Sequence, residues 1–409
     1  MGTPDARIAK AVRILWVDKD TEKGREALAL LQEAVDEGNP DAYYYLAGCY
    51  AGRQYVNYGF GFEEDDAKVD ELLNLSIEKG SALGMFAARR FGGYEPKGGS
   101  FIHEPYHSNK EIWDAVCKIA DSGDLFTKYL VANAFYYGDV IELSEFDMSK
   151  VKDIDAQIRV FQNIACRMYD ELLAEGMTMG AGNYIDILTS GDYGMPKDVK
   201  KAEAVKRLAA DHGELYFMME VGKSLRKTEP TKAAEYFERA LRKGDAQAGF
   251  FLGKMYTYGG ELPQDLSKAK MLFEECLKTG ADDVGCNNRL GELYFRGGDF
   301  SEPDYRKAAE HFLAAQKEEN FWSSDMLGTC YLKGWGVEQD YAKAKEQFDR
   351  YPGEELAAIG LGEIYAYGLG VPVNVKKAME SWNLFATDPR VIENKKNFKK
   401  TLFGWKRIF

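Results

Sequence analysis

Small and apolar residues recur along the chain with the spacing of a helix. They stand at offsets 0, +4 and +7, and a glycine often follows at +11. Two clear copies are Ala233-Phe237-Ala240-Gly244 and Ala269-Phe273-Cys276-Gly280. These offsets place the apolar residues on one helix face, and the glycine suits the left-handed residue that ends a helix. Further copies begin at Ala27, Val69, Ile112, Ala165, Ala202, Ala308, Ala344 and Ala378.

A second helical pattern precedes most copies of the first. It is Ala248, Leu252-Gly253, Tyr256 and Gly259, and closely similar runs begin at Cys286, Ser323 and Ala357, with looser ones at Ala42, Thr127, Gly180 and Phe217. A glycine inside a helix costs about 1 kcal/mol relative to alanine, so its recurrence predicts close contact with another helix. The recurring tyrosine is predicted to lie in the core. Between the two patterns, a glycine ends one helix and an Asp or Asn caps the next.

The alternation of the two patterns predicts an all-α chain of helix pairs. We expect a divergent N-terminal pair at residues 1–40 that acts as a cap. Nine repeats follow, at 41–80, 81–123, 124–176, 177–213, 214–244, 245–280, 281–320, 321–353 and 354–388. Residues 389–409 form a basic, amphipathic segment, predicted to be a helix that caps the last repeat.

The repeated Leu-Gly-x2-Tyr and Lys-Ala residues resemble the Sel-one-like repeat family, an α/α relative of the tetratricopeptide repeat. The match is specific over 177–388 and weaker over 21–176. The resemblance implies a right-handed α/α superhelix whose first helices line a concave surface. It also implies work as an adaptor or scaffold for other proteins and, as a rule, no enzymatic activity.

Charge narrows the choice of partner. The net charge of the whole chain is −13. The last 21 residues contribute +6, so residues 1–388 sum to −19. Such an acidic body repels phosphate backbones, which argues against nucleic acid and favours a basic protein, including a toxin that this chain would neutralise as an immunity or inhibitor protein. No signal peptide and no 18-residue apolar run is visible, so we expect a cytoplasmic protein.

Several aromatic residues of the first helices lie off the core pattern and are candidates for partner binding. They are Tyr43, Tyr44, Tyr129, Tyr136, Tyr137, Tyr216, Phe250 and Tyr258. Tyrosine offers rigid contact area with a polar tip, although packing between repeats explains these positions equally well. Inserted loops at 53–66, 92–109 and 139–158 either add to the binding surface or are passive variation.

Chemical motifs are few, and we expect no catalytic residue, metal or cofactor. His103 and His107 are four residues apart, but Pro105 between them argues against a helical metal site. Ser224-x-x-Lys227 and Lys278-Thr279-Gly280 match penicillin-recognising motifs, without the S-D-N between them. Cys276 and Cys286 lie on consecutive helices, and buried free thiols are the favoured interpretation over a disulfide. The alternatives to a scaffold are a hydrolase at these motifs or a membrane-surface adaptor using the basic tail.

Overall fold

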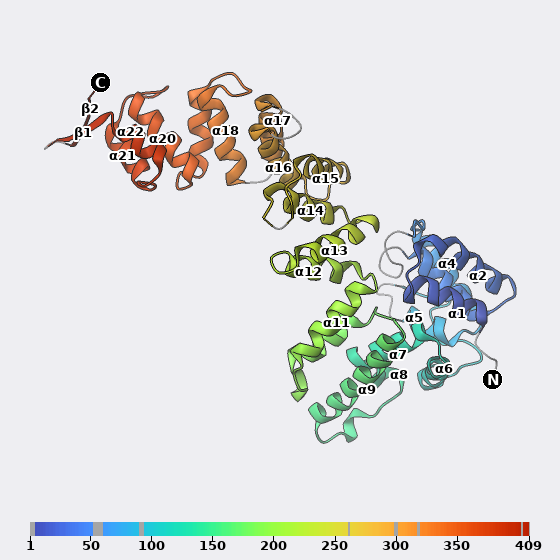
Figure 1. Cartoon of the computed structure of the whole chain (residues 1–409). Helices are drawn as coiled ribbons and strands as arrows, with labels where there is room; N and C mark the ends of the chain where they lie inside the picture. The colour runs from blue at the N-terminus through green and yellow to red at the C-terminus, as the bar shows by residue number, and fades with distance from the viewer. Residues whose placement is uncertain are drawn as a thin grey trace. The chain divides into compact units, whose positions relative to one another are not determined.

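The contacts of the chain divide it into two compact units. The structure, a computed structural model, describes residues 5–51, 60–89, 94–260, 262–297, 302–316, 320–401 and 404–408. Unit 1 comprises residues 1–225 and 235–245, and unit 2 comprises residues 226–234 and 246–409. In both units, helices that follow one another along the chain pack side by side (Figure 1).

Unit 1 is helical throughout its described residues. Its elements are α1 Ala6–Val12, η1 Arg13–Val17, η2 Thr21–Lys23, α2 Gly24–Asp36, α3 Pro40–Tyr50, α4 Asp66–Glu78, α5 Ala82–Ala88, α6 Asn109–Asp121, α7 Leu125–Tyr137, α8 Val140–Leu143, η4 Met148–Lys150, α9 Ile154–Ala174, α10 Ala181–Ser190, η5 Asp192–Gly194, α11 Val199–Asp211 and α12 Leu215–Leu225. Helix α13, Pro230–Arg242, contributes residues to both units.

Unit 2 is helical except at its end. Its elements are α14 Ala246–Tyr258, α15 Leu266–Thr279, α16 Asp283–Arg296, α17 Tyr305–Ala315, α18 Phe321–Lys333, α19 Tyr341–Arg350, α20 Glu355–Tyr367, α21 Val375–Asn383, α22 Pro389–Lys395, β1 Phe398–Thr401 and β2 Gly404–Arg407. The all-α, helical-repeat fold class is confirmed.

The apolar stripe of the second helices forms the core, as predicted. In α15, Ala269, Phe273 and Cys276 are buried, and in α17 the matching Ala308 and Phe312 are buried too. Complete burial of a large side chain such as Phe273 stabilises the fold by about 1.5–3 kcal/mol. A stripe repeated in every pair therefore supplies a continuous source of stability along each unit.

Many of the helices end at glycines and begin at Asp or Asn caps, as predicted. The terminal glycines have positive φ, from +67° at Gly280 to +104° at Gly123. At the start of α15, the Asp265 side chain accepts a hydrogen bond from the Lys268 backbone N–H, at 2.8 Å. The same cap recurs three residues before a lysine at Asp65, Asp198, Asp304, Asp340 and Asn374.

The recurring tyrosine of the first helices is only partly a core residue. Tyr294 is buried, but Tyr256, Tyr331 and Tyr365 are half-buried. The ammonium of Lys268 lies 4.3 Å from the centre of the Tyr256 ring. Lysines lie over the other three rings at 5.1–5.4 Å. Tyr256, Tyr331 and Tyr365 still pack against the apolar core, as predicted, and the lysine beside the small stripe residue adds a cation over each ring.

The basic C-terminal segment is a short helix and a hairpin, not the predicted capping helix. Helix α22 ends at Lys395, and β1 and β2 pair antiparallel with Lys399 opposite Lys406. Phe398 is 5% exposed, and its ring centre lies 5.7 Å from that of Trp382. The segment still covers the last repeat, but through Val391 of α22 and Phe398 of β1.

Candidate protein-binding surface

Two of the predicted partner-binding aromatics are core residues. Tyr43 and Tyr44 of α3 are 8% and 3% exposed. The Tyr44 ring packs edge-on against Tyr45 at 5.5 Å and lies 6.1 Å from Phe126 of α7. The expectation that they are displayed to a partner is corrected: packing between helix pairs buries both rings. Phe250 is half-buried against Phe273 in the core of unit 2.

The remaining predicted aromatics reach the surface. Tyr137, Tyr216 and Tyr258 are 60%, 70% and 51% exposed, whereas Tyr129 and Tyr136 are half-buried. Exposed tyrosine rings are suitable anchors for a partner because they bury much area at little entropic cost. Their role in binding stays a prediction.

The N-terminal segment covers one side of unit 1. Trp16, in the π-helical turn η1, is 1% exposed, and its ring centre lies 4.5 Å from that of Phe126 in α7. Three residues on, the buried Lys19 ammonium donates to Thr178 at 2.7 Å and pairs with Glu214 at 2.5 Å. The Trp16 ring, which also lies 6.1 Å from that of Tyr45, therefore packs against both α3 and α7, which the expectation of a terminal cap did not include.

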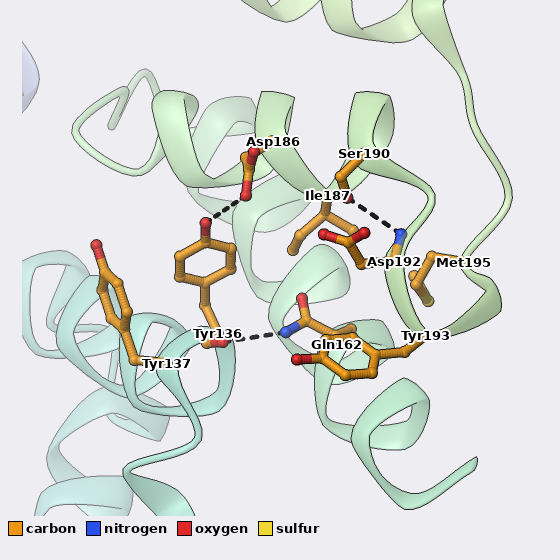
Figure 2. A pocket seen from close by; sticks show the side chains of 9 residues that line it. All are labelled: Tyr136, Tyr137, Gln162, Asp186, Ile187, Ser190, Asp192, Tyr193 and Met195. Atoms are coloured by element: carbon orange, nitrogen blue, oxygen red, sulfur yellow. Dashed lines mark hydrogen bonds between the residues drawn. The ribbon is translucent and has the colours of Figure 1, made fainter. Parts of the chain in front are cut away.

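A pocket opens where α7, α9 and α10 meet in unit 1. It encloses about 260 Å³ and is lined by Tyr136, Tyr137, Gln162, Asp186, Ile187, Ser190, Asp192, Tyr193 and Met195 (Figure 2). Two of the predicted residues, Tyr136 and Tyr137, are brought together here at the end of α7. The pocket residues from α9 and from the η5 turn were not predicted.

Hydrogen bonds hold the walls of this pocket. The Tyr136 hydroxyl donates to Asp186 Oδ2 at 2.5 Å, and Asn183 Oδ1 accepts from the Tyr137 hydroxyl at 3.4 Å. Burial raises the pKa of Tyr136, and the adjacent Asp186 carboxylate raises it further, so this hydroxyl stays protonated at neutral pH. The Gln162 amide donates to the Tyr136 carbonyl at 3.0 Å, which ties α9 to the end of α7.

A second pocket shares Tyr137 with the first. It encloses about 500 Å³ and is lined by Arg89, Tyr137, Asp139, Glu142 and Leu143. Asp139, Glu142 and Leu143 belong to the inserted segment 139–158. Arg89 pairs with Glu142 and donates to Asn109 at 2.6 Å. The insertion therefore contributes acidic side chains to the surface beside an exposed tyrosine. Of the other insertions, residues 53–59 and 92–93 lie outside the described residues.

In unit 2, the exposed Tyr258 is anchored by charged neighbours. Its hydroxyl donates to Glu292 at 3.1 Å, and it accepts from Arg289. Glu292 also pairs with Arg289 and Arg296, both at 2.8 Å, so this nearly buried carboxylate is fully compensated. The ring is thus fixed on the surface of α14.

The candidate catalytic and metal residues do not assemble into a site. His103 and His107 lie in a non-helical loop, where the His103 ring contacts the Ser100 carbonyl at 3.1 Å. Ser224 bonds its own helix through the Val221 carbonyl at 2.8 Å, and Gly280 is the left-handed cap of α15. Across the described residues, no group of three metal-ligating side chains occurs.

The cysteines are free thiols, as favoured. Cys276 and Cys286 are both buried between α15 and α16. The hydrogen bond with Cys276, together with burial, raises the pKa of the Cys286 thiol, which keeps it protonated. Both side chains lie in the buried apolar core of unit 2, where they serve as packing groups.

This architecture defines an α/α helical-repeat protein. Five segments match the model of the Sel1 repeat, at residues 202–245, 246–275, 285–315, 325–346 and 356–380. The chain therefore carries Sel1 repeats in this part of its sequence, as the Leu-Gly-x2-Tyr and Lys-Ala patterns indicated. Sel1-repeat proteins generally mediate interactions between proteins, and their fold is typically non-catalytic. None of the described helices has the length and apolar character needed to cross a membrane.

Known proteins similar to this chain come from plants and bacteria. A component of an ERAD-associated E3 ubiquitin-protein ligase, HRD3B of Arabidopsis thaliana, is 32% identical over 111 residues, which are 27% of this chain and 17% of that protein. A protective antigen of uropathogenic Escherichia coli with an SLR fold is 22% identical over 96% of this chain and 79% of its own, with a TM-score of 0.51. A Sel1 repeat protein of Oxalobacter formigenes is 17% identical over 97% of this chain and 95% of its own, with a TM-score of 0.42.

Proposed function

We propose that this protein is a non-catalytic scaffold that binds a basic partner protein through the exposed tyrosines of its first helices. The observation that carries the proposal is the surface around Tyr137, where acidic side chains flank a 60% exposed aromatic ring. Asp186 and Asp192 share the first pocket with this ring, and the second pocket adds Asp139 and Glu142, of which Glu142 is paired with Arg89. An aromatic anchor ringed by carboxylates suits a partner that presents lysine or arginine.

The charge of the chain supports the same proposal. Residues 1–388 carry a net charge of −19, which attracts a cationic protein over a distance of about 10 Å at ordinary ionic strength. A basic toxin is one such partner, and inhibition of it would make this chain an immunity protein. The cytoplasmic location expected from the sequence belongs to this proposal.

The N-terminal segment packs against part of α3 and α7 and leaves the Tyr137 surface accessible to a partner. Because Trp16 already packs against Tyr45 of α3 and Phe126 of α7, a partner would have to displace buried contacts to reach that part of those helices. The end of α7, with Tyr136 and Tyr137, lies outside these contacts and needs no rearrangement.

Affinity purification with the full chain tests the proposal. The bait is compared with a double variant, Asp139→Asn with Asp192→Asn, and with Glu33→Gln, which removes one exposed charge from α2. We expect a basic protein to be enriched by the wild type and by Glu33→Gln, and at least tenfold less by the double variant. A partner captured equally by all three baits, or capture that rises with salt concentration, would contradict the proposal.

A second candidate function is suggested by the hairpin β1–β2. Lys399, Lys400 and Lys406 are exposed beside Trp405 and Ile408, which are 38% and 46% exposed. Cations next to exposed apolar groups favour an anionic membrane surface. Co-sedimentation with vesicles containing phosphatidylserine tests this function, with Lys400→Glu and Lys406→Glu combined as the variant. Equal sedimentation of the variant and the wild type would end it.

A further inference from the structure

We propose that the pocket formed by α7, α9 and α10 binds the guanidinium group of an arginine side chain presented by a partner protein. This inference rests on the proposed function and deepens it, because it assigns one pocket and one side chain to the contact. The pocket combines a buried acceptor, two carboxylates and three tyrosine rings within one unit.

The buried acceptor is the side-chain carbonyl of Gln162. This residue is 7% exposed, and its amide nitrogen is used by the Tyr136 carbonyl at 3.0 Å. Its oxygen, Oε1, has no hydrogen-bond partner, and Figure 2 shows it directed into the pocket. A buried acceptor left unpaired is destabilising, because it has lost its hydrogen bonds to water without gaining another partner. A donor supplied by a ligand would remove that destabilisation.

The two carboxylates of the pocket favour a donor that carries a positive charge. Asp186 accepts the Tyr136 hydroxyl through Oδ2, which leaves its second oxygen for a ligand. Asp192 is exposed at the mouth of the pocket. Two cations of the chain lie near. Arg159 donates to the Tyr193 carbonyl at 2.8 Å, and the Lys197 side chain packs along Gly191. Neither lines the pocket.

The tyrosine rings favour arginine over lysine. Tyr136 and Tyr137 meet edge to face with ring centres 4.7 Å apart, and Tyr193 lies across the pocket beside Gln162 (Figure 2). A planar guanidinium can stack on such a ring while its five N–H groups reach acceptors on different walls, whereas an ammonium is a compact, strongly hydrated charge. The acceptors come from three different segments, at Gln162, Asp186 and Asp192. They therefore suit the N–H groups of a guanidinium, which point in several directions.

Saturation-transfer NMR on the full chain tests the inference with small probes. The probes are acetyl-arginine methylamide, acetyl-lysine methylamide, whose side-chain amine is free, and acetyl-citrulline methylamide, which keeps the arginine shape without its charge. We expect arginine to bind at least fivefold more tightly than lysine, and citrulline to give no saturable signal. Competition with free arginine amide should remove the signal.

Variants assign that signal to the pocket. Asp192→Asn changes an exposed side chain and should weaken arginine binding at least fivefold with an unchanged melting temperature. Gln162→Met removes the buried acceptor and should weaken it further. Glu33→Gln, on α2, is the matched control and should bind like the wild type. Equal signals for arginine and citrulline, or equal binding by wild type and Asp192→Asn, would overturn the inference.

These results are separate from the test of the scaffold function. If a basic partner is captured and Asp192→Asn alone captures it equally well, the scaffold function stands and the arginine pocket is overturned. If arginine binds in the pocket but no partner is captured, the pocket stands and the scaffold function fails.

Discussion

The ring of Phe273 in α15 occupies the space where Gly253 of α14 would carry a side chain. A β-carbon added at Gly253 would lie 2.7 Å from Cε1 of this ring, well inside van der Waals contact. The same relationship joins the glycine and the large aromatic of other pairs, at Gly222 with Phe237, Gly291 with Phe312, Gly328 with Phe348 and Gly362 with Trp382. The glycine thus allows two helices of a pair to meet over one buried ring.

Replacing Gly253 with alanine is expected to lower the free energy of unfolding by about 2 kcal/mol. The added methyl must displace a ring that is fully buried, and overpacking of this kind costs about 1–3 kcal/mol. Chemical denaturation followed by circular dichroism measures the change. Gly182→Ala in α10 is the control, because a β-carbon there meets nothing within 4 Å. That variant should be neutral or gain up to about 1 kcal/mol from helix propensity. Equal losses in both would contradict the packing role.

This pairing could be predicted from the sequence because both partners recur at fixed offsets within one repeat. The glycine of the Leu-Gly-x2-Tyr pattern and the aromatic of the Lys-Ala pattern are separated by one short turn, so local periodicity determines their contact. The caps at Asp265 and Gly280 could be predicted for the same reason. The hairpin could not be predicted in this way, because helical spacing relates Phe398, Leu402 and Trp405. Gly404 disfavours a helix, and Phe398 instead packs on Trp382.

Truncation of Tyr44 is expected to lower the stability of the protein much more than truncation of Tyr216. Tyr44→Ala empties a site that is 3% exposed and should cost about 3 kcal/mol of stability. Tyr216, 70% exposed at the start of α12, should change stability by less than about 0.5 kcal/mol when replaced by alanine. Thermal denaturation of both variants gives the answer. A large loss at Tyr216 would mean that its ring packs against the protein and is not available to a partner.

The binding surface was harder to predict than the repeats because it depends on contacts between distant segments. Tyr43 and Tyr44 were expected on the surface, yet Phe126 of α7 packs against Tyr44 within a buried aromatic group that Trp16 of η1 completes. No periodic signal marks Trp16 as a contact of α3 and α7. The pocket likewise needs Gln162 of α9 beside Tyr136 of α7, and the insertion before α9 obscures their register.

The β1–β2 hairpin should stabilise unit 2 through the ring of Phe398. Phe398→Ala removes the contact with Trp382 and is expected to lower the unfolding free energy by about 3 kcal/mol. Trp405→Ala, on the paired strand and 38% exposed, should cost less than about 1 kcal/mol. Hydrogen exchange of α20 and α21 locates the effect. Unchanged protection in Phe398→Ala would show that the hairpin does not cover the last repeat.

Asp325 in α18 is expected to make the stability of unit 2 fall as the pH rises from about 4 to about 7. Burial, together with the nearby charges of Glu354 and Glu355, raises the pKa of this carboxyl to about 7, although the N–H groups of Leu356 and Ala357 partly oppose the rise. The folded state therefore holds a proton that the unfolded state releases above its ordinary pKa of 3.8. Its stabilising effect is complete below pH 4 and is lost as the pH passes 7.

Asp325→Asn should remove this dependence, because an amide stays neutral at every pH. Relative to the wild type, we expect the variant to gain about 2–4 kcal/mol between pH 4 and pH 8. Urea denaturation at both pH values measures the unfolding free energies of the variant and the wild type. Subtracting one from the other cancels the titration of all other groups. Glu338→Gln, which removes an exposed acid after α18, is the control. A constant difference between Asp325→Asn and the wild type across this range would show that Asp325 is already ionised in the folded protein.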